Sequence, residues 1–87
     1  MSKRFLVELY TIVCIELHDD VLNAVNDDWR KNFYNLTDSK QIAEHIAYNM
    51  VINDAKLSQL DGWADQPNDN AEILLSPKWD VNVLEEQ

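Results

Sequence analysis

The feature that most constrains the fold is a long alternation of apolar residues near the start of the chain. The odd positions carry apolar or β-branched side chains, namely Phe5, Val7, Leu9, Thr11, Val13, Ile15 and Leu17. A repeat of two is typical of one face of a β-strand. The sequence therefore predicts a strand over residues 5–17 with this face in the core. At about 3.3 Å per residue it would be long for a small domain, so we expect a bend or bulge within it.

The opposite face of this strand has a mixed composition. Its even positions combine Leu6, Tyr10, Ile12 and Cys14 with Glu8 and Glu16. Because this face is only partly polar, we expect part of it to contact a helix, a second protomer or another partner.

A second alternation lies near the end of the chain. It runs through Ile73, Leu75, Trp79, Val81 and Val83, and Ser76-Pro77 interrupts it. Proline lacks a backbone donor, so this dipeptide marks either a bend or the corner of a hairpin. The unbroken repeat favours one interrupted strand.

Two helical regions are expected between these strands. Asp19 or Asp20 can cap a helix with Val21, Leu22, Val25 and Trp29 on its inner side, and Asp28 can begin a second short helix instead. Farther on, Asp38 and Gln41 have the spacing of a capping box. The helix after them has an apolar stripe of Ile42, Ala43, Ile46, Ala47, Met50 and Val51. Leu57 and Leu60 indicate one more turn, and Gly62 provides a helix stop.

These elements predict one α+β domain over residues 1–87. A small antiparallel sheet, made of the long N-terminal strand and a C-terminal strand or hairpin, would carry two or three helices on one face. The expected core consists of Val7, Leu9, Val13, Ile15, Ile46, Met50, Leu75 and Val81.

Charge limits the partners that this domain can bind. The 87 residues contain 16 acidic and 7 basic side chains, a formal charge of -9. Direct binding to nucleic acid or to an anionic membrane is therefore unfavourable, and a basic protein surface is the expected partner. A solubilising role for the acidic surface is the alternative. The single cysteine excludes an intrachain disulfide and suits a reducing cytosol.

No catalytic or metal-binding motif is found in the sequence. Cys14, His18 and His45 have no partner at catalytic or ligand spacing, so we expect them to do no chemistry. The one glycine cannot form a phosphate-binding loop, and the acidic stretch from Asp61 to Glu72 lacks the order of a calcium loop. The sequence therefore predicts a non-enzyme without a cofactor or metal.

Partner-binding residues are expected where acidic side chains surround the Gly62-Trp63 loop and begin the second helical region. The candidates are Asp61, Trp63, Asp65, Asp69, Asp27 and Asp28. Fixed carboxylates can occupy a basic groove that otherwise binds a phosphate backbone, and an exposed Trp can anchor an interface. The alternative for Trp63 is that it folds back to close the core.

Two segments resemble small phage and prophage proteins over residues 40–70. They are Ile42-Ala43-Glu44-His45-Ile46-Ala47-Tyr48-Asn49 and Leu57-Ser58-Gln59-Leu60-Asp61-Gly62-Trp63-Ala64-Asp65-Gln66-Pro67. The resemblance implies a phage accessory protein in the bacterial cytosol, a class whose small acidic members include anti-CRISPR and other counter-defence inhibitors. We therefore expect a non-enzymatic inhibitor that blocks a basic, nucleic-acid-binding site of a host defence protein. The alternative is a structural or assembly-type protein that acts as a homo-oligomer, for example a homodimer built through the mixed face of the first strand.

Overall fold

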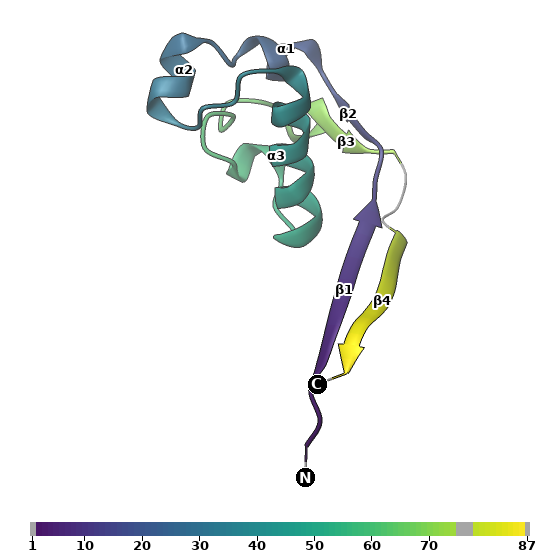
Figure 1. The fold of residues 1–87 in the computed structure, drawn as a ribbon. Coiled ribbons are helices and arrows are strands. Elements are labelled where there is room, and N and C mark those ends of the chain that lie inside the picture. The colour runs from purple at the N-terminus through teal and green to yellow at the C-terminus, as the bar shows by residue number, and fades with distance from the viewer. Residues whose placement is uncertain (1, 75–77, 87) are drawn as a thin grey trace.

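The computed structural model, which describes residues 2–74 and 78–86, consists of a helical head and a two-stranded β-ribbon (Figure 1). Along the chain the elements are β1 (Phe5–Ile12), β2 (Ile15–Leu17), α1 (Asp19–Asn23), α2 (Asp27–Asn32), α3 (Ser39–Ile52), the 3-10 turns η1 (Leu57–Gln59) and η2 (Asn68–Asn70), β3 (Ala71–Ile73) and β4 (Lys78–Glu86). The predicted α+β class is confirmed, and so is the pairing of a long N-terminal strand with a C-terminal strand.

The strands form two antiparallel pairs, each a two-stranded sheet. β1 pairs with β4 from Phe5 opposite Glu86 to Ile12 opposite Lys78, and β2 pairs with β3. Between the two parts, the Leu74 amide donates a hydrogen bond of 2.8 Å to the Cys14 carbonyl oxygen. The expected irregularity in the first strand is thus confirmed as a break after Ile12. A register shift at Leu6 and Val7 adds a β-bulge.

The second alternation forms one interrupted strand. β3 and β4 each pair with the N-terminal strand and not with each other, which excludes the alternative of a hairpin between them. Leu75 and Ser76-Pro77 lie outside the described residues.

The first helical region forms two short helices, as one of the two interpretations predicted. Their caps differ from the prediction. His18 begins α1, because its Nδ1 accepts a hydrogen bond of 3.1 Å from the Asp20 amide. Asn26 begins α2, because its Oδ1 accepts a bond of 2.9 Å from the Trp29 amide. An aspartate pair follows each cap, where carboxylates stabilise the positive end of a helix.

Asp38 caps α3 as predicted, with its Oδ1 accepting a hydrogen bond of 2.8 Å from the Gln41 amide. The expected capping box is shifted by one residue. Gln41 Oε1 accepts from the Thr37 amide at 2.7 Å, not from the Asp38 amide. The helix buries Ile42 and Ile46, as its apolar stripe predicted.

The core lies in the head, under α1, α2 and α3. Its fully buried side chains are Val21, Ile46, Leu57 and Trp63, and Val25, Trp29, Ile42, Leu60 and Ala71 surround them. The predicted core was partly wrong. Ile46 is buried, and Val13, Ile15 and Met50 are partly buried, but Val7, Leu9 and Val81 are 43%, 62% and 66% exposed. The reason is that the helices cover the β2–β3 end of the ladder and leave β1 and β4 uncovered (Figure 1).

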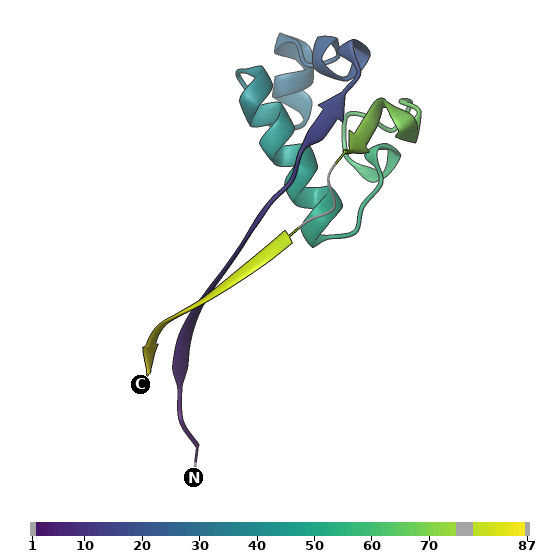
Figure 2. The same ribbon diagram turned by 90° about the vertical axis from the view of Figure 1, so that its right-hand side faces the viewer.

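The ribbon gives the molecule an elongated shape. Its principal extents are 53 × 28 × 21 Å. Figure 2 shows β1 and β4 leaving the head side by side, and both termini lie at the far end of the ribbon.

Candidate interaction surface

One face of the ribbon is made of exposed apolar side chains. The cross-strand pairs are Val7 with Val83, Leu9 with Val81, and Thr11 with Trp79. Because side chains alternate along a strand, Phe5 lies on the same face as Val7 and Leu9. We call the set of Phe5, Val7, Leu9, Trp79, Val81 and Val83 the apolar face. Its six side chains are between 43% and 66% exposed.

The other face of the ribbon is mixed, as the even positions predicted. Glu8 lies opposite Asn82, and Tyr10 lies opposite Asp80. Leu6 and Ile12 complete this side on β1, and Ile12 is 75% exposed. Between Val7 and Thr11, the paired positions of the apolar face contain no charged side chain, whereas those of the mixed face contain Glu8 and Asp80. The two faces therefore suit partner surfaces of different chemistry.

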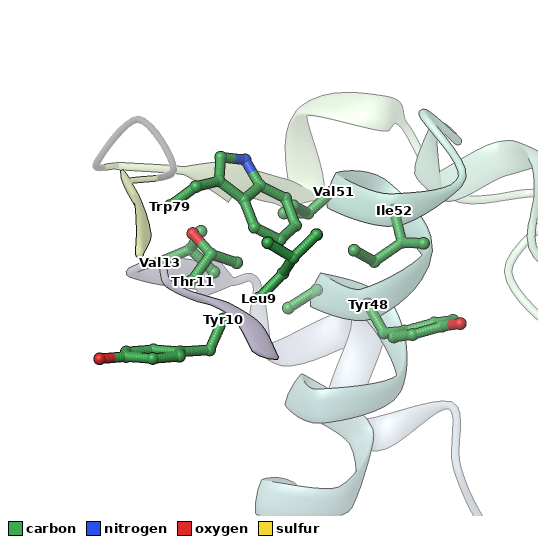
Figure 3. A pocket seen from close by; sticks show the side chains of 9 residues that line it. Leu9, Tyr10, Thr11, Val13, Tyr48, Val51, Ile52 and Trp79 are labelled. Atoms are coloured by element: carbon green, nitrogen blue, oxygen red, sulfur yellow. The ribbon is translucent and has the colours of Figure 1, made fainter. Parts of the chain in front are cut away.

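A groove lies where the apolar face meets α3. It has a volume of about 280 Å³ and is lined by the ribbon residues Leu9, Thr11 and Trp79 and by Ala47, Tyr48, Val51 and Ile52 of the helix, together with Tyr10 and Val13. In Figure 3, Leu9 and the Trp79 ring point toward the helix, whereas the Tyr10 ring points away from it. Tyr48 and Ile52 are 60% and 48% exposed. The apolar face thus continues from the ribbon onto the end of α3.

The predicted aspartates are exposed and lie on the head. Asp27 and Asp28 form the first turn of α2, where Asp27 Oδ1 lies 3.1 Å from Arg30 Nη1. Asp61 and Asp65 line a shallow hollow beside Phe33, so α2 and the Gly62-Trp63 loop are neighbours. Asp69 lies in the separate turn η2. The structure therefore places four of the five aspartates on two adjacent segments.

Trp63 is a core side chain, so its expected role as a partner-binding residue needs correction. It is 1% exposed. Its Nε1 donates a hydrogen bond of 3.1 Å to the Val21 carbonyl oxygen, and its ring centroid lies 4.7 Å from that of Trp29. This agrees with the alternative that Trp63 closes the core.

The side chains considered for chemistry lie at separate places with structural contacts. Cys14 is exposed at the break in the ladder, and His18 caps α1. His45 packs on the Tyr34 ring at a centroid distance of 4.4 Å, and burial lowers its pKa. Within residues 2–74 and 78–86, no group of three or more His, Cys, Asp or Glu side chains is placed to hold a metal ion.

Charge and apolar surface are separated along the molecule. Residues 13–74, which form the head, contain twelve acidic and four basic side chains, a formal charge of -8 out of the total of -9. The remaining residues therefore have a formal charge of only -1. The head is strongly acidic, whereas the ribbon is nearly neutral and apolar.

The comparisons give no relative from which a function could be transferred. No protein-family model, curated protein or solved structure matches the chain. None of the helices in the described part of the chain is long and apolar enough to cross a membrane.

The residues that sequence reasoning missed are those of the apolar face. Val7, Leu9 and Val81 were assigned to the core, since alternation shows that side chains share a face but not what covers it. One available signal was the position of both alternating segments at the two ends of the chain, outside the helical region.

Proposed function

We propose that this chain is a non-enzymatic interaction protein that binds another macromolecule through the apolar face of its ribbon. The observation that carries the proposal is the exposure of this face, whose six large apolar side chains are 43–66% exposed and which meets the head only in the groove at α3. Monomeric soluble proteins rarely expose contiguous apolar patches beyond a few hundred Å².

The energetics of the ribbon support the same proposal. A two-stranded antiparallel pair is at best marginally stable in water and needs a further strand or a packed layer on its apolar side. Here the described strands β1 and β4 form a two-stranded sheet of their own, and both have an outer edge without a neighbouring strand. A partner that covers the apolar face would supply the missing layer.

The contacts of the reactive side chains also favour binding over catalysis. The three side chains lie at separate places: Cys14 is exposed between β1 and β2, His18 caps α1, and His45 packs on Tyr34. The groove at α3 is lined mainly by apolar side chains, which suits contact with an apolar partner surface.

Two matched substitutions test the proposal. Val81→Glu places a charge on the apolar face, and Ile12→Glu places the same charge on the mixed face, opposite Lys78 in the register. We expect affinity capture from a cell lysate, and self-association of the purified chain, to depend on Val81 but not on Ile12. Equal binding by both folded variants in every assay would contradict the assignment of the apolar face.

A second candidate function is favoured by the concentration of charge on the head. A formal charge of -8 on residues 13–74, with exposed Asp27, Asp28, Asp61, Asp65 and Asp69, suits an inhibitor that occupies a basic site of a host protein. In this role the carboxylates would replace a phosphate backbone, as anti-CRISPR-type inhibitors that mimic nucleic acid do.

The triple variant Asp61→Asn, Asp65→Asn and Asp69→Asn tests this second function. All three side chains are exposed, so folding should be retained. Association with a captured basic partner should slow at low salt, because long-range attraction steers encounter. Unchanged association kinetics at low salt would exclude this group of aspartates as the contact surface.

A further inference from the structure

We infer that the partner of the apolar face is a second copy of this chain, with the two ribbons packed face to face and running in opposite directions. This inference rests on the proposed function and names its partner. In the arrangement, the tip of each ribbon, at Phe5, Val7 and Val83, covers the groove between Trp79 and α3 of the other copy.

The apolar face is complementary to itself. A two-fold interface requires that one surface patch fit the same patch on the second copy. The pairs Val7–Val83 and Leu9–Val81 contain no charge, so stacking them on their own copies brings no like charges together. The mixed face is less complementary to itself, because stacking two mixed faces would bring the carboxylates of Glu8 and Asp80 near those of the second copy.

The groove at α3 determines the direction of the second ribbon. In Figure 3 it is open between Leu9, Trp79 and the helix residues Tyr48 and Ile52. A two-fold axis near Leu9 and Val81 places Val7 of one copy over Thr11 of the other, and Phe5 beyond it over Val13, a residue of the groove. Parallel ribbons would instead stack tip on tip, with Val7 of one copy over Val83 of the other, and would leave both grooves empty.

The charge distribution favours the same direction. Each head carries a formal charge of -8, so two heads repel each other at short range. Both termini lie at the tip of the ribbon, away from the head (Figure 1). Opposed ribbons therefore put the two heads at opposite ends of the dimer, where salt screens much of their repulsion.

The buried area is sufficient for a stable dimer. Each copy contributes the six side chains of the apolar face together with Tyr48 and Ile52, all about half exposed. Aromatic side chains bury about 150–250 Å² each, and with the smaller aliphatic ones included, roughly 80–100 Å² per half-exposed side chain is available for burial. Two copies would then bury about 1,300–1,600 Å², within the range of specific protein interfaces.

The first test is the mass of the purified full chain in solution across a dilution series. The monomer has a mass of 10.2 kDa, and we expect a species of twice that mass. Because the symmetry places each substitution in the interface twice, Val81→Glu should raise the dimer dissociation constant by about a hundredfold, and Ile12→Glu by less than about threefold. Circular dichroism, and fluorescence of the buried Trp29 and Trp63, check that the heads of both variants are folded.

The second test is a cross-link that depends on ribbon direction. In a Cys14→Ser background, one preparation carries Arg4→Cys at the ribbon tip and the other carries Asn53→Cys at the end of α3, so neither change removes an apolar contact. Mixed and treated with a short bismaleimide, they should form a heterodimer. Arg4→Cys alone should not cross-link to itself, and Asp27→Cys on α2 should not replace Asn53→Cys.

The outcomes separate this inference from the proposed function. A chain that is monomeric throughout, but whose capture of a different protein depends on Val81, overturns the second copy as partner and leaves the apolar face as the binding surface. A dimer that cross-links Arg4→Cys to itself overturns the opposed direction. A monomer without any Val81-dependent partner overturns both.

Discussion

Gly62 joins the acidic loop to the core, and replacing it by alanine tests how tightly that loop is packed. Its φ of +96° lies in the region that side chains rarely adopt. The Trp29 indole covers the glycine and donates a hydrogen bond of 3.1 Å from its Nε1 to the Gly62 carbonyl oxygen. A Cβ on residue 62 would lie 2.4 Å from that nitrogen, too close for any real contact. Gly62→Ala therefore strains the backbone and forces the indole to move.

The size of the effect follows from these two contributions. A side chain in a sparsely populated backbone region costs about 1–3 kcal/mol, and overpacking a well-packed ring costs a further 1–3 kcal/mol. The Trp29 ring has little room to move, because its centroid lies 4.7 Å from Trp63 and 5.2 Å from Phe33. We expect the free energy of unfolding to fall by about 2–6 kcal/mol, a large part of the roughly 5–15 kcal/mol of a typical domain.

A double-mutant cycle in urea separates strain from overlap. Trp29→Phe removes the indole atoms nearest the new Cβ, which include Nε1. The double variant Gly62→Ala with Trp29→Phe should therefore be more stable than the sum of the single changes implies, by about 1–3 kcal/mol. A loss below about 1 kcal/mol for Gly62→Ala, or strict additivity in the cycle, would refute this account of the loop.

Three further predictions concern the head. Ile46→Ala should lower the free energy of unfolding by about 2–5 kcal/mol in chemical denaturation, because Ile46 is fully buried, and a loss below 1 kcal/mol would contradict its place in the core. Asp38→Ala should cost about 0.5–2 kcal/mol through loss of the bond to the Gln41 amide, and Asp38→Asn should restore most of it. Burial lowers the pKa of His45 in the folded protein below 6.5, so the unfolded chain takes up a proton on this residue at a higher pH than the folded chain does. The contribution of neutral His45 to the free energy of unfolding is therefore present above pH 6.5 and is lost as the pH falls through the lowered pKa. The melting temperature of the wild type should therefore fall relative to His45→Gln between pH 7.5 and 5.5, and a constant difference would contradict the lowered pKa of the half-buried His45.

Local patterns in the sequence predicted most of the elements, because each depends on neighbouring residues. The stripe from Ile42 to Val51 and the cap at Asp38 predicted α3, and the strand alternations predicted the ladder with its break. The caps at His18 and Asn26 were assigned to nearby aspartates, because several side chains in a row can accept the same backbone hydrogen bond.

The position of each apolar side chain relative to the head could not be predicted in the same way. Trp63 and Val81 are both large apolar residues near polar neighbours, yet Trp63 is buried and Val81 is 66% exposed. The difference depends on which end of the ladder the helices cover. That choice is made by long-range packing of Val21, Ile46 and Leu57, whose contacts leave no local repeat in the sequence.

The pairing of β1 with β4 also determines the order in which the protein can be built. During synthesis Phe5–Ile12 emerges before the head, whereas its partner Lys78–Glu86 emerges only after the whole head has been made. In that interval β1 is an apolar, β-prone segment without a neighbouring strand, the kind of segment that pairs with other chains. The acidic residues of the head emerge in the same interval. Their like charges oppose contact between nascent chains in the interval before β4 can pair with β1.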